Sequence, residues 1–332
     1  MTSKIRALWV VVVGIELIGI LVIGYQYYAK KFGSEYPKNI RVTPISKDYV
    51  LFPTDTTLQY YDEPKANIST EEDVASIGLP SSKIIQTFNE DGLNERFDYS
   101  IKKSKGVYRI ISLGDSFTQG AFVETKQNYS EVLEDMLNAK VTCPGTVRFE
   151  VINLGVLGYD MQYNLERFKR KGLKYDPDLV ILWTNDNDYD VPSEAIRKFT
   201  SEWDPNGEAP ELVNKYRALG DFYPEQTVLF NKFYETHPRN ELIKEEAQYL
   251  REFVSLYSGP LVVFTVASFP QDIRSQIEPI LSVRPNIHFY PEIPDDFDKL
   301  PDQHPSPVGH QQFATFLFTK LATLTGFLCQ KP

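Results

Sequence analysis

Short apolar runs alternate with amphipathic segments along most of the chain, and this pattern predicts its secondary structure. The run Leu179–Trp183 is apolar throughout, as in a strand buried on both faces of a parallel sheet. Arg239–Leu256 instead has the helical period, with apolar residues recurring every three or four positions. The other expected strands are Val107–Leu113, Phe149–Leu154, Leu261–Val266 and Asn286–Tyr290, and the other expected helices are Tyr129–Leu137, Gln162–Lys171 and Val308–Phe327. Strands that alternate with helices predict an α/β fold, a doubly wound (flavodoxin-like) parallel sheet flanked by helices.

A longer apolar run near the N-terminus has a different character. Residues 7–28 are apolar except for Glu16 and Gln26, and this length crosses a hydrocarbon core about 30 Å thick. The run ends in tyrosines and lysines rather than at a small-residue cleavage site, which favours a retained anchor over a cleaved signal peptide. We therefore expect residues 1–31 to hold a single-pass transmembrane helix. Both flanks are basic, so charge leaves the orientation open; our expectation is a soluble domain outside the cytoplasm, periplasmic or extracellular.

The remainder of the chain divides by composition into two parts. Residues 32–105 are polar and are interrupted by five prolines, which is typical of an extended approach segment rather than a second domain. Residues 106–328 contain the alternating strands and helices and form the predicted α/β domain. Within this domain, residues 192–238 lack a clear period, and we expect them to form a helical excursion over the site.

Charge and residue counts exclude several classes of function. The chain has 35 basic and 45 acidic residues, a net charge of −10, which disfavours binding to the phosphate backbone of a nucleic acid. Its two cysteines, Cys143 and Cys329, exclude a disulfide scaffold and a cysteine-rich zinc module but leave one disulfide open. No two of the four histidines stand at ligand spacing on one helix, so we expect neither a metal nor another cofactor.

Candidate catalytic groups follow the predicted strands, at the carboxyl edge of the sheet where such folds bind ligands. Ser116 comes just after the strand Val107–Leu113 and lies between glycines, which suits a tight turn that exposes its hydroxyl. Serine needs an imidazole to take its proton, and the imidazole benefits from a carboxylate that fixes its tautomer. Asp302 and His304 supply these groups within one proline-stiffened loop. Taken alone, each loop is equally consistent with an ordinary turn, and His310 is more typical of a packing or capping residue.

Two further loops offer donors for the oxyanion of a tetrahedral intermediate. Gly158 has a backbone N–H with no side chain to obstruct a substrate, and Asn185 and Asn187 follow the buried strand Leu179–Trp183. Such an intermediate needs two or three donors that converge on one oxygen. By itself, however, the Asn/Asp run is more typical of an ordinary turn.

Together the four loops resemble the sequence blocks of the SGNH (GDSL-type) hydrolases. The matching segments, in the family's order, are residues 114–120, 153–158, 185–188 and 302–310. The resemblance spans residues 107–327 and implies Ser116 as nucleophile, His304 as base and Asp302 as the acid that orients it. It also implies an oxyanion hole made by the Ser116 and Gly158 amides and the Asn187 side chain.

The chain departs from the family pattern at three positions. The family more often has its aspartate three residues before the histidine, where this chain has Pro301, so that Asp302 is the nearest carboxylate. Asn185 replaces the glycine of the third block and is an alternative donor, although the spacing from the strand favours Asn187. Asn94 stands where the segment before the first block usually has arginine.

The resemblance implies a serine esterase that acts on O-acyl esters. Members with an anchor and a single domain often act on O-acyl groups of glycans, so we expect O-acetyl esters, on a carbohydrate, as substrates. An O-acyltransferase is the alternative, because a sugar hydroxyl and water compete for the same acyl-serine. A non-catalytic binding protein that retains the fold is a third interpretation, against which the intact Ser116, His304 and Asn187 weigh.

Overall fold

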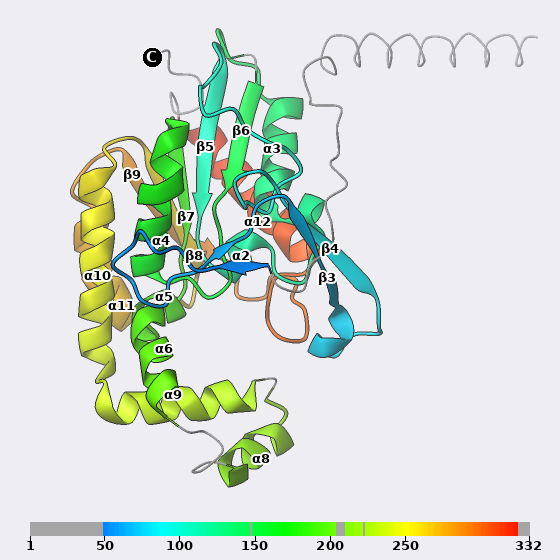
Figure 1. The fold of residues 1–332 in the computed structure, drawn as a ribbon. Coiled ribbons are helices and arrows are strands. Elements are labelled where there is room, and N and C mark those ends of the chain that lie inside the picture. The colour runs from blue at the N-terminus through cyan, green and yellow to red at the C-terminus, as the bar shows by residue number, and fades with distance from the viewer. Residues whose placement is uncertain (1–48, 147, 204–209, 222, 325–332) are drawn as a thin grey trace, which may run out of the picture. The chain divides into compact units, whose positions relative to one another are not determined.

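Five parallel strands form the central sheet of the computed structural model, which describes residues 49–324 except 147, 204–209 and 222. Their order across the sheet is β6-β5-β7-β8-β9 (Figure 1). The strands are β5 (Val107–Leu113), β6 (Arg148–Asn153), β7 (Leu179–Trp183), β8 (Leu261–Val266) and β9 (Ile287–Ile293). In chain order this is the 2-1-3-4-5 arrangement of a doubly wound sheet. The predicted α/β fold, a parallel sheet flanked by helices, is confirmed.

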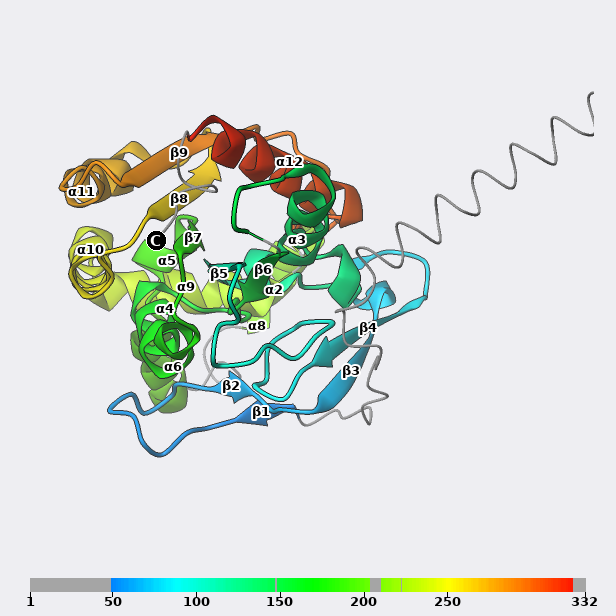
Figure 2. The same cartoon turned by 90° about the horizontal axis from the view of Figure 1, so that it is seen from above.

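Helices cover both faces of the sheet (Figure 2). One face packs against α3 (Tyr129–Lys140) and α12 (Pro307–Thr323), and the other against α4 (Met161–Arg167), α10 (Arg239–Leu256) and α11 (Gln271–Leu281). Successive residues of a strand point to opposite faces, so Leu182 joins the core under α10 and Trp183 joins the core under α12. Both faces of the sheet are therefore covered by apolar side chains and shielded from water, which explains why β7 is apolar at every position.

The sequence located most of these elements, with differences at their ends. The bounds of β7, α10 and β8 agree with the expected ranges, whereas β9 runs three residues further than predicted. The helix expected at residues 162–171 is divided into α4 and a π-helical turn, Phe168–Gly172, in which the absent side chain of Gly172 leaves room for the Phe168 ring. The end of the last predicted helix, residues 325–327, lies outside the described residues.

The segment before β5 contains two small antiparallel sheets that the sequence analysis did not predict. One pairs β1 (Val50–Leu51) with β2 (Glu63–Pro64), and the other pairs β3 (Ile68–Asp73) with β4 (Lys83–Phe88). Between β3 and β4, Val74 and Ile77 form a buried apolar cluster with Leu300, and Phe122 packs against this cluster. This hairpin therefore lies beside the loop that carries Asp302 and His304.

Three helices occupy the described part of residues 192–238. They are α6 (Ser193–Glu202), α8 (Pro210–Ala218) and α9 (Pro224–Thr236). Ile196 of α6 and Phe233 of α9 are buried together with Val191 and Leu242. The helices lie at the end of the molecule toward which the strand arrows point (Figure 1). We call residues 192–238 the excursion; its three described helices lie at the carboxyl edge of the sheet.

The predicted anchor, within residues 1–31, lies outside the described residues. Within the part of the chain that the structure describes, no helix combines the length and the apolar character needed to cross a membrane.

Candidate active site

Ser116 lies at the turn between β5 and the short helix α2 (Ser116–Gln119). Asp115 caps this helix by accepting a 2.9 Å hydrogen bond from the N–H of Phe117. Gly114 has φ +148°, and a Cβ there would stand 2.2 Å from Thr118 Oγ1, so the turn requires glycine. Two residues thus separate β5 from α2, and Ser116 lies at the start of α2 with 7% of its surface exposed.

His304 links Ser116 to Asp302 through both of its ring nitrogens. His304 Nε2 is 2.9 Å from Ser116 Oγ, and His304 Nδ1 is 2.7 Å from Asp302 Oδ2. The backbone N–H of His304 also donates to Asp302 Oδ1, at 3.3 Å. Ser116 and His304 are 188 residues apart in the chain. The structure therefore brings together the three side chains that the sequence singled out for nucleophilic chemistry.

The loop that carries Asp302 and His304, residues 298–306, is closed by its own backbone. Leu300 N–H donates to the carbonyl of His304 at 2.8 Å, and Gln303 N–H donates to the carbonyl of Leu300 at 3.0 Å. At the end of the loop Ser306 caps α12 by accepting from two backbone amides, and its own hydroxyl donates to Asp298. The position of His304 is thus set by backbone bonds and not only by its side-chain partners.

Two phenylalanine rings flank the imidazole of His304. The ring centres of Phe117 and Phe122 lie 5.4 and 5.3 Å from that of His304. Phe122 has φ +61°, which is unusual for a bulky side chain and costs backbone strain. A left-handed phenylalanine has no local sequence signal, so this contact was not predicted.

Asp302 is buried, yet its pKa is lowered. Burial on its own would raise the pKa, but hydrogen bonds from His304 and from the phenol of Tyr223 stabilise the carboxylate and outweigh it. Tyr223 Oη donates to Asp302 Oδ2 at 3.0 Å. Tyr223 belongs to the excursion, where the sequence has no clear hydrophobic period, so Tyr223 was not predicted as a residue of the site.

The second loop places Gly158 at the surface beside α2. Gly155 packs so closely that a Cβ there would stand 2.4 Å from the backbone nitrogen of Gln119, which fixes this loop against α2. Gly158 has φ +74°, and a Cβ built on it would meet no atom within 4 Å. Within the described part of the chain, the N–H of Gly158 donates no hydrogen bond, so it is available to a substrate oxygen.

The two candidate asparagines of the third loop differ in their hydrogen bonds and in their exposure. Asn185 Nδ2 donates to Asp115 Oδ2 at 2.5 Å, and Asp115 directly precedes Ser116. Asn187 is the first residue of α5 (Asn187–Asp190) and is exposed, and its side chain bonds to no other described residue. Asn185, rather than Asn187, is thus brought into contact with the first loop.

Two buried carboxyl groups lie beneath this loop. Burial raises the pKa of Asp115 to about 6, although the Phe117 amide, His304 and Asn185 oppose the rise. Asp188 accepts from Thr184 Oγ1 at 2.9 Å and from the N–H of Asn185 at 3.0 Å. Burial, together with the charge of Asp115, raises the pKa of Asp188 well above its ordinary value. Asp188 thereby holds the backbone of Asn185 while Asp115 holds its side chain.

His310 is a packing residue, as its position in the sequence indicated. It is fully buried, and its Nδ1 accepts a 3.2 Å hydrogen bond from the N–H of Tyr129. Burial lowers the pKa of His310 to about 3, with a further contribution from His304, so its ring is neutral at ordinary pH.

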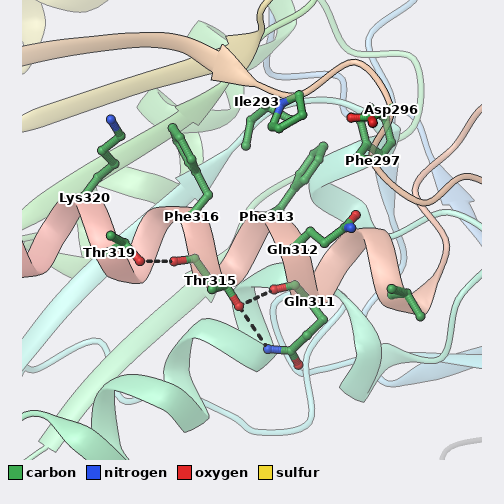
Figure 3. Close-up of a pocket in the computed structure, with 12 residues that line it drawn as sticks. Ile293, Asp296, Phe297, Gln311, Gln312, Phe313, Thr315, Phe316, Thr319 and Lys320 are labelled. Atoms are coloured by element: carbon green, nitrogen blue, oxygen red, sulfur yellow. Dashed lines mark hydrogen bonds between the residues drawn. The ribbon is translucent and has the colours of Figure 1, made fainter.

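A hollow of about 530 Å³ lies along α12 (Figure 3). Its lining includes Phe297, Phe313 and Lys320 but none of Ser116, Asp302 and His304. Among the described residues, no group of three or more His, Cys, Asp or Glu side chains is placed to hold a metal ion.

Comparison with known proteins gives one family match, over residues 112–312, to the GDSL-like lipase/acylhydrolase family. No curated protein matches the chain.

The solved structures to which this chain is similar include an acetylxylan esterase from Geobacillus stearothermophilus, with 13% identity over 64% of this chain and 94% of that chain and a TM-score of 0.38. The esterase EstA from a Pseudoalteromonas species has 13% identity over 64% and 96%, with a TM-score of 0.37. A lipase/acylhydrolase from Enterococcus faecalis has 15% identity over 64% and 95%, with a TM-score of 0.38.

Proposed function

This chain belongs to the GDSL-like lipase/acylhydrolase family and is a serine hydrolase that acts on ester bonds, and from this premise we propose that Ser116, His304 and Asp302 form its catalytic triad. The observation that carries the proposal is the unbroken line of hydrogen bonds from Ser116 Oγ through the imidazole to Asp302. The lowered pKa of Asp302 supports it further, because an ionised carboxylate is what the imidazole needs as its partner.

The reaction follows from the geometry of the imidazole. Because His304 Nδ1 donates to Asp302, Nε2 carries the lone pair that faces Ser116. Nε2 takes the hydroxyl proton as Oγ attacks the ester carbonyl, and the carbonyl oxygen becomes an oxyanion. When the C–O bond breaks, His304 gives this proton to the departing alcohol and leaves an acyl group on Ser116. Water, activated by the same imidazole, then releases the acid and restores Ser116.

The oxyanion hole that we propose has two backbone donors and one carboxamide. The backbone donors are the N–H groups of Ser116 and Gly158. For the carboxamide, the spacing in the sequence favours Asn187, whereas the bond from Asn185 to Asp115 is an observation in favour of Asn185. We therefore take Asn185 as the leading donor and retain Asn187 as the alternative.

The substrate that we propose is an O-acyl ester, most often an O-acetyl group, carried by a glycan. The family match supports the ester, and the resemblance to anchored members with a single domain supports the glycan. Hydrolysis predicts that acetate is released from acetylated oligosaccharides in water, whereas an acyltransferase would need a sugar acceptor for turnover.

We propose that the protein is a single-pass membrane protein whose hydrolase domain lies outside the cytoplasm. The support is the apolar run at residues 7–28 and the presence of a disulfide at Cys143. Disulfides persist in oxidising compartments and are rare in the cytosol. The sequence holds one other cysteine, Cys329, which lies outside the described residues. Release by detergent but not by salt, and a gain of two thiols after reduction, are the expected results.

The triad is tested by labelling the full-length protein in detergent with a serine-reactive fluorophosphonate. We expect the label on the peptide that contains Ser116, and we expect Ser116→Ala to remove both the label and the hydrolysis of p-nitrophenyl acetate. Loss of the nucleophile in such triads lowers kcat by about 10⁴–10⁶-fold. Ser268→Ala is the matched control, because Ser268 is an exposed serine just after β8, at the same edge of the sheet. Labelling or hydrolysis that survives Ser116→Ala would overturn the serine mechanism.

A further inference from the structure

The carboxylate of Asp302 has a second hydrogen-bond donor that comes from outside the sheet and its loops. Its Oδ2 accepts both from His304 Nδ1, at 2.7 Å, and from Tyr223 Oη, at 3.0 Å. Tyr223 lies 79 residues earlier in the chain, in the excursion and just before α9. One oxygen of Asp302 therefore joins the triad to a segment that contributes nothing to the sheet.

The turn that presents Tyr223 is itself held in place. Asp221 accepts from the N–H of Tyr223 at 2.8 Å through one oxygen and from Thr227 Oγ1 at 2.5 Å through the other. Pro224 follows at the first position of α9, where its fixed φ favours the start of a helix. Near the C-terminal end of α9, Phe233 is fully buried among apolar residues that include Ile196 of α6 and Leu242 of α10. The phenol thus reaches Asp302 from an ordered support.

The contact also protects Asp302 from water. The Asp302 side chain has no exposed surface, whereas Tyr223 is 40% exposed and covers it from the side of the excursion. A carboxylate that is shielded from water and held by two hydrogen-bond donors has one orientation and cannot turn toward solvent. The hydrogen bond from Tyr223 is also one of the causes that lower the pKa of Asp302.

We propose that Tyr223 is a positioning residue of the active site, through which the excursion orients and shields Asp302 and thereby sets the geometry and basicity of His304. This inference rests on the proposed function, since it assumes that Asp302 serves the triad. Tyr223 does not touch the reacting atoms and acts only through Asp302.

The direction of the pH effect follows from the groups that surround the pair. Those that face Asp302 or His304 are Tyr223 from the excursion, Glu72 from β3, Asp115 from the first loop and His310 from α12. Removing the phenol hydroxyl raises the pKa of Asp302, because the carboxylate loses a donor. A more basic Asp302 holds the protonated imidazole more firmly, so a higher pH is needed to free Nε2. The acidic limb of the kcat/KM profile therefore moves to higher pH.

The test compares Tyr223→Phe with Tyr216→Phe in the full-length protein, using p-nitrophenyl acetate between pH 5 and 9. Tyr216 is the matched control, because it belongs to the same excursion and, among the described residues, its hydroxyl accepts a hydrogen bond from Asn231 and none reaches Asp302. We expect Tyr223→Phe to lower kcat about three- to tenfold, the net effect of one ordinary hydrogen bond, with KM within twofold and the acidic limb at higher pH. Tyr216→Phe should match wild type.

Two results would overturn the inference. One is a Tyr223→Phe variant with unchanged kcat and an unchanged profile; the other is a lower kcat with an unmoved acidic limb, which would indicate structural support alone. Ser116→Ala, assayed in parallel, separates these failures from failure of the proposed function. Activity that survives in that variant would show that Ser116 is not the nucleophile, and the proposed triad would then be wrong.

Discussion

Buried carboxyl groups in two regions of this molecule have pKa values that are shifted in opposite directions. Asp302, beside His304, has a lowered pKa. Around Tyr99, at the contact between α3 and β6, burial and neighbouring carboxyls raise the pKa of Glu134 to about 8 and that of Glu95 well above its ordinary value. Side chains of all three are buried, so burial alone does not separate the two groups.

The difference lies in what faces each carboxylate. Asp302 accepts from two side-chain donors, His304 and Tyr223, and within the described residues it forms no hydrogen bond with another acid. Glu95 and Glu134 share the hydroxyl of Tyr99 and also face Glu131, so each disfavours the charge of the other. We infer that Asp302 is built to stay ionised, whereas Glu95 and Glu134 hold protons and join structural elements.

The glutamates at α3 have a clear structural task. Glu134 accepts from the N–H of Val151 at 2.7 Å, and Glu95 accepts from the N–H of Asn153. They thereby tie α3 and the segment before β5 to the edge strand β6. The comparison thus predicts that changes at Asp302 affect catalysis and that changes at the glutamates affect stability.

Asp302→Asn is the sharpest test of the first half of the comparison. An asparagine keeps the shape of the side chain but loses the charge and favours the wrong imidazole tautomer, so we expect kcat to fall about 10³–10⁴-fold. Thermal unfolding should stay within a few degrees of wild type. The measurement is kcat on p-nitrophenyl acetate with a melting curve for each variant.

Asp296→Asn provides the control, because Asp296 is an exposed aspartate just before the same loop and contacts neither His304 nor Ser116. If Asp302→Asn retains activity within a few-fold of wild type, catalysis does not depend on the Asp302 carboxylate, and the enzyme acts through Ser116 and His304 alone.

The third loop gives an effect of intermediate size. Asn185→Ala removes a carboxamide that Asp115 holds beside Ser116, and loss of one oxyanion donor lowers kcat about 10²–10³-fold with little change in KM. Asn187→Ala should have a smaller effect, because that side chain is exposed and unsupported. The reverse ranking would restore Asn187 as the donor, as the spacing in the sequence favoured. Steady-state kinetics of the two variants side by side decide the matter.

The sequence predicted the parts of this molecule that have local signals. A strand buried on both faces is apolar at nearly every position, so the bounds of β7 and β8 were predicted to the residue. Glycine-bounded turns after such strands marked the loops of Ser116 and Gly158, and the order of the four loops indicated the family. Asp302 and His304 stand two residues apart, so their pairing was visible in the sequence.

The contacts that were missed join distant segments. Tyr223 meets Asp302 across 79 residues and Asn185 meets Asp115 across 70, and no period or spacing encodes either contact. The hairpin of β3 and β4 was missed because its few apolar positions, such as Ile84 and Phe88, are spread among polar ones. These features depend on tertiary packing, which one sequence specifies only through the complete fold.

Glu134→Gln tests the structural half of the comparison and has the smallest expected effect on activity, none at pH 7. The pKa of Glu134 is raised in the folded protein to about 8, whereas an unfolded glutamate has its ordinary value near 4.3. The folded state therefore binds a proton that the unfolded state releases, and wild-type stability falls as pH rises between these two values.

One such proton changes the free energy of unfolding by at most about 1.4 kcal/mol per pH unit. Glutamine cannot titrate and can still accept from Val151 or Tyr99, so we expect the melting temperature of the variant to fall less steeply than that of wild type between pH 5 and 8. Some slope remains, because Glu95 also holds a proton. Glu252→Gln, an exposed glutamate paired with Lys169, should follow wild type. Parallel curves for Glu134→Gln and wild type would show that these glutamates are ionised in the fold, and the contrast with Asp302 would then rest on something other than the supply of hydrogen-bond donors.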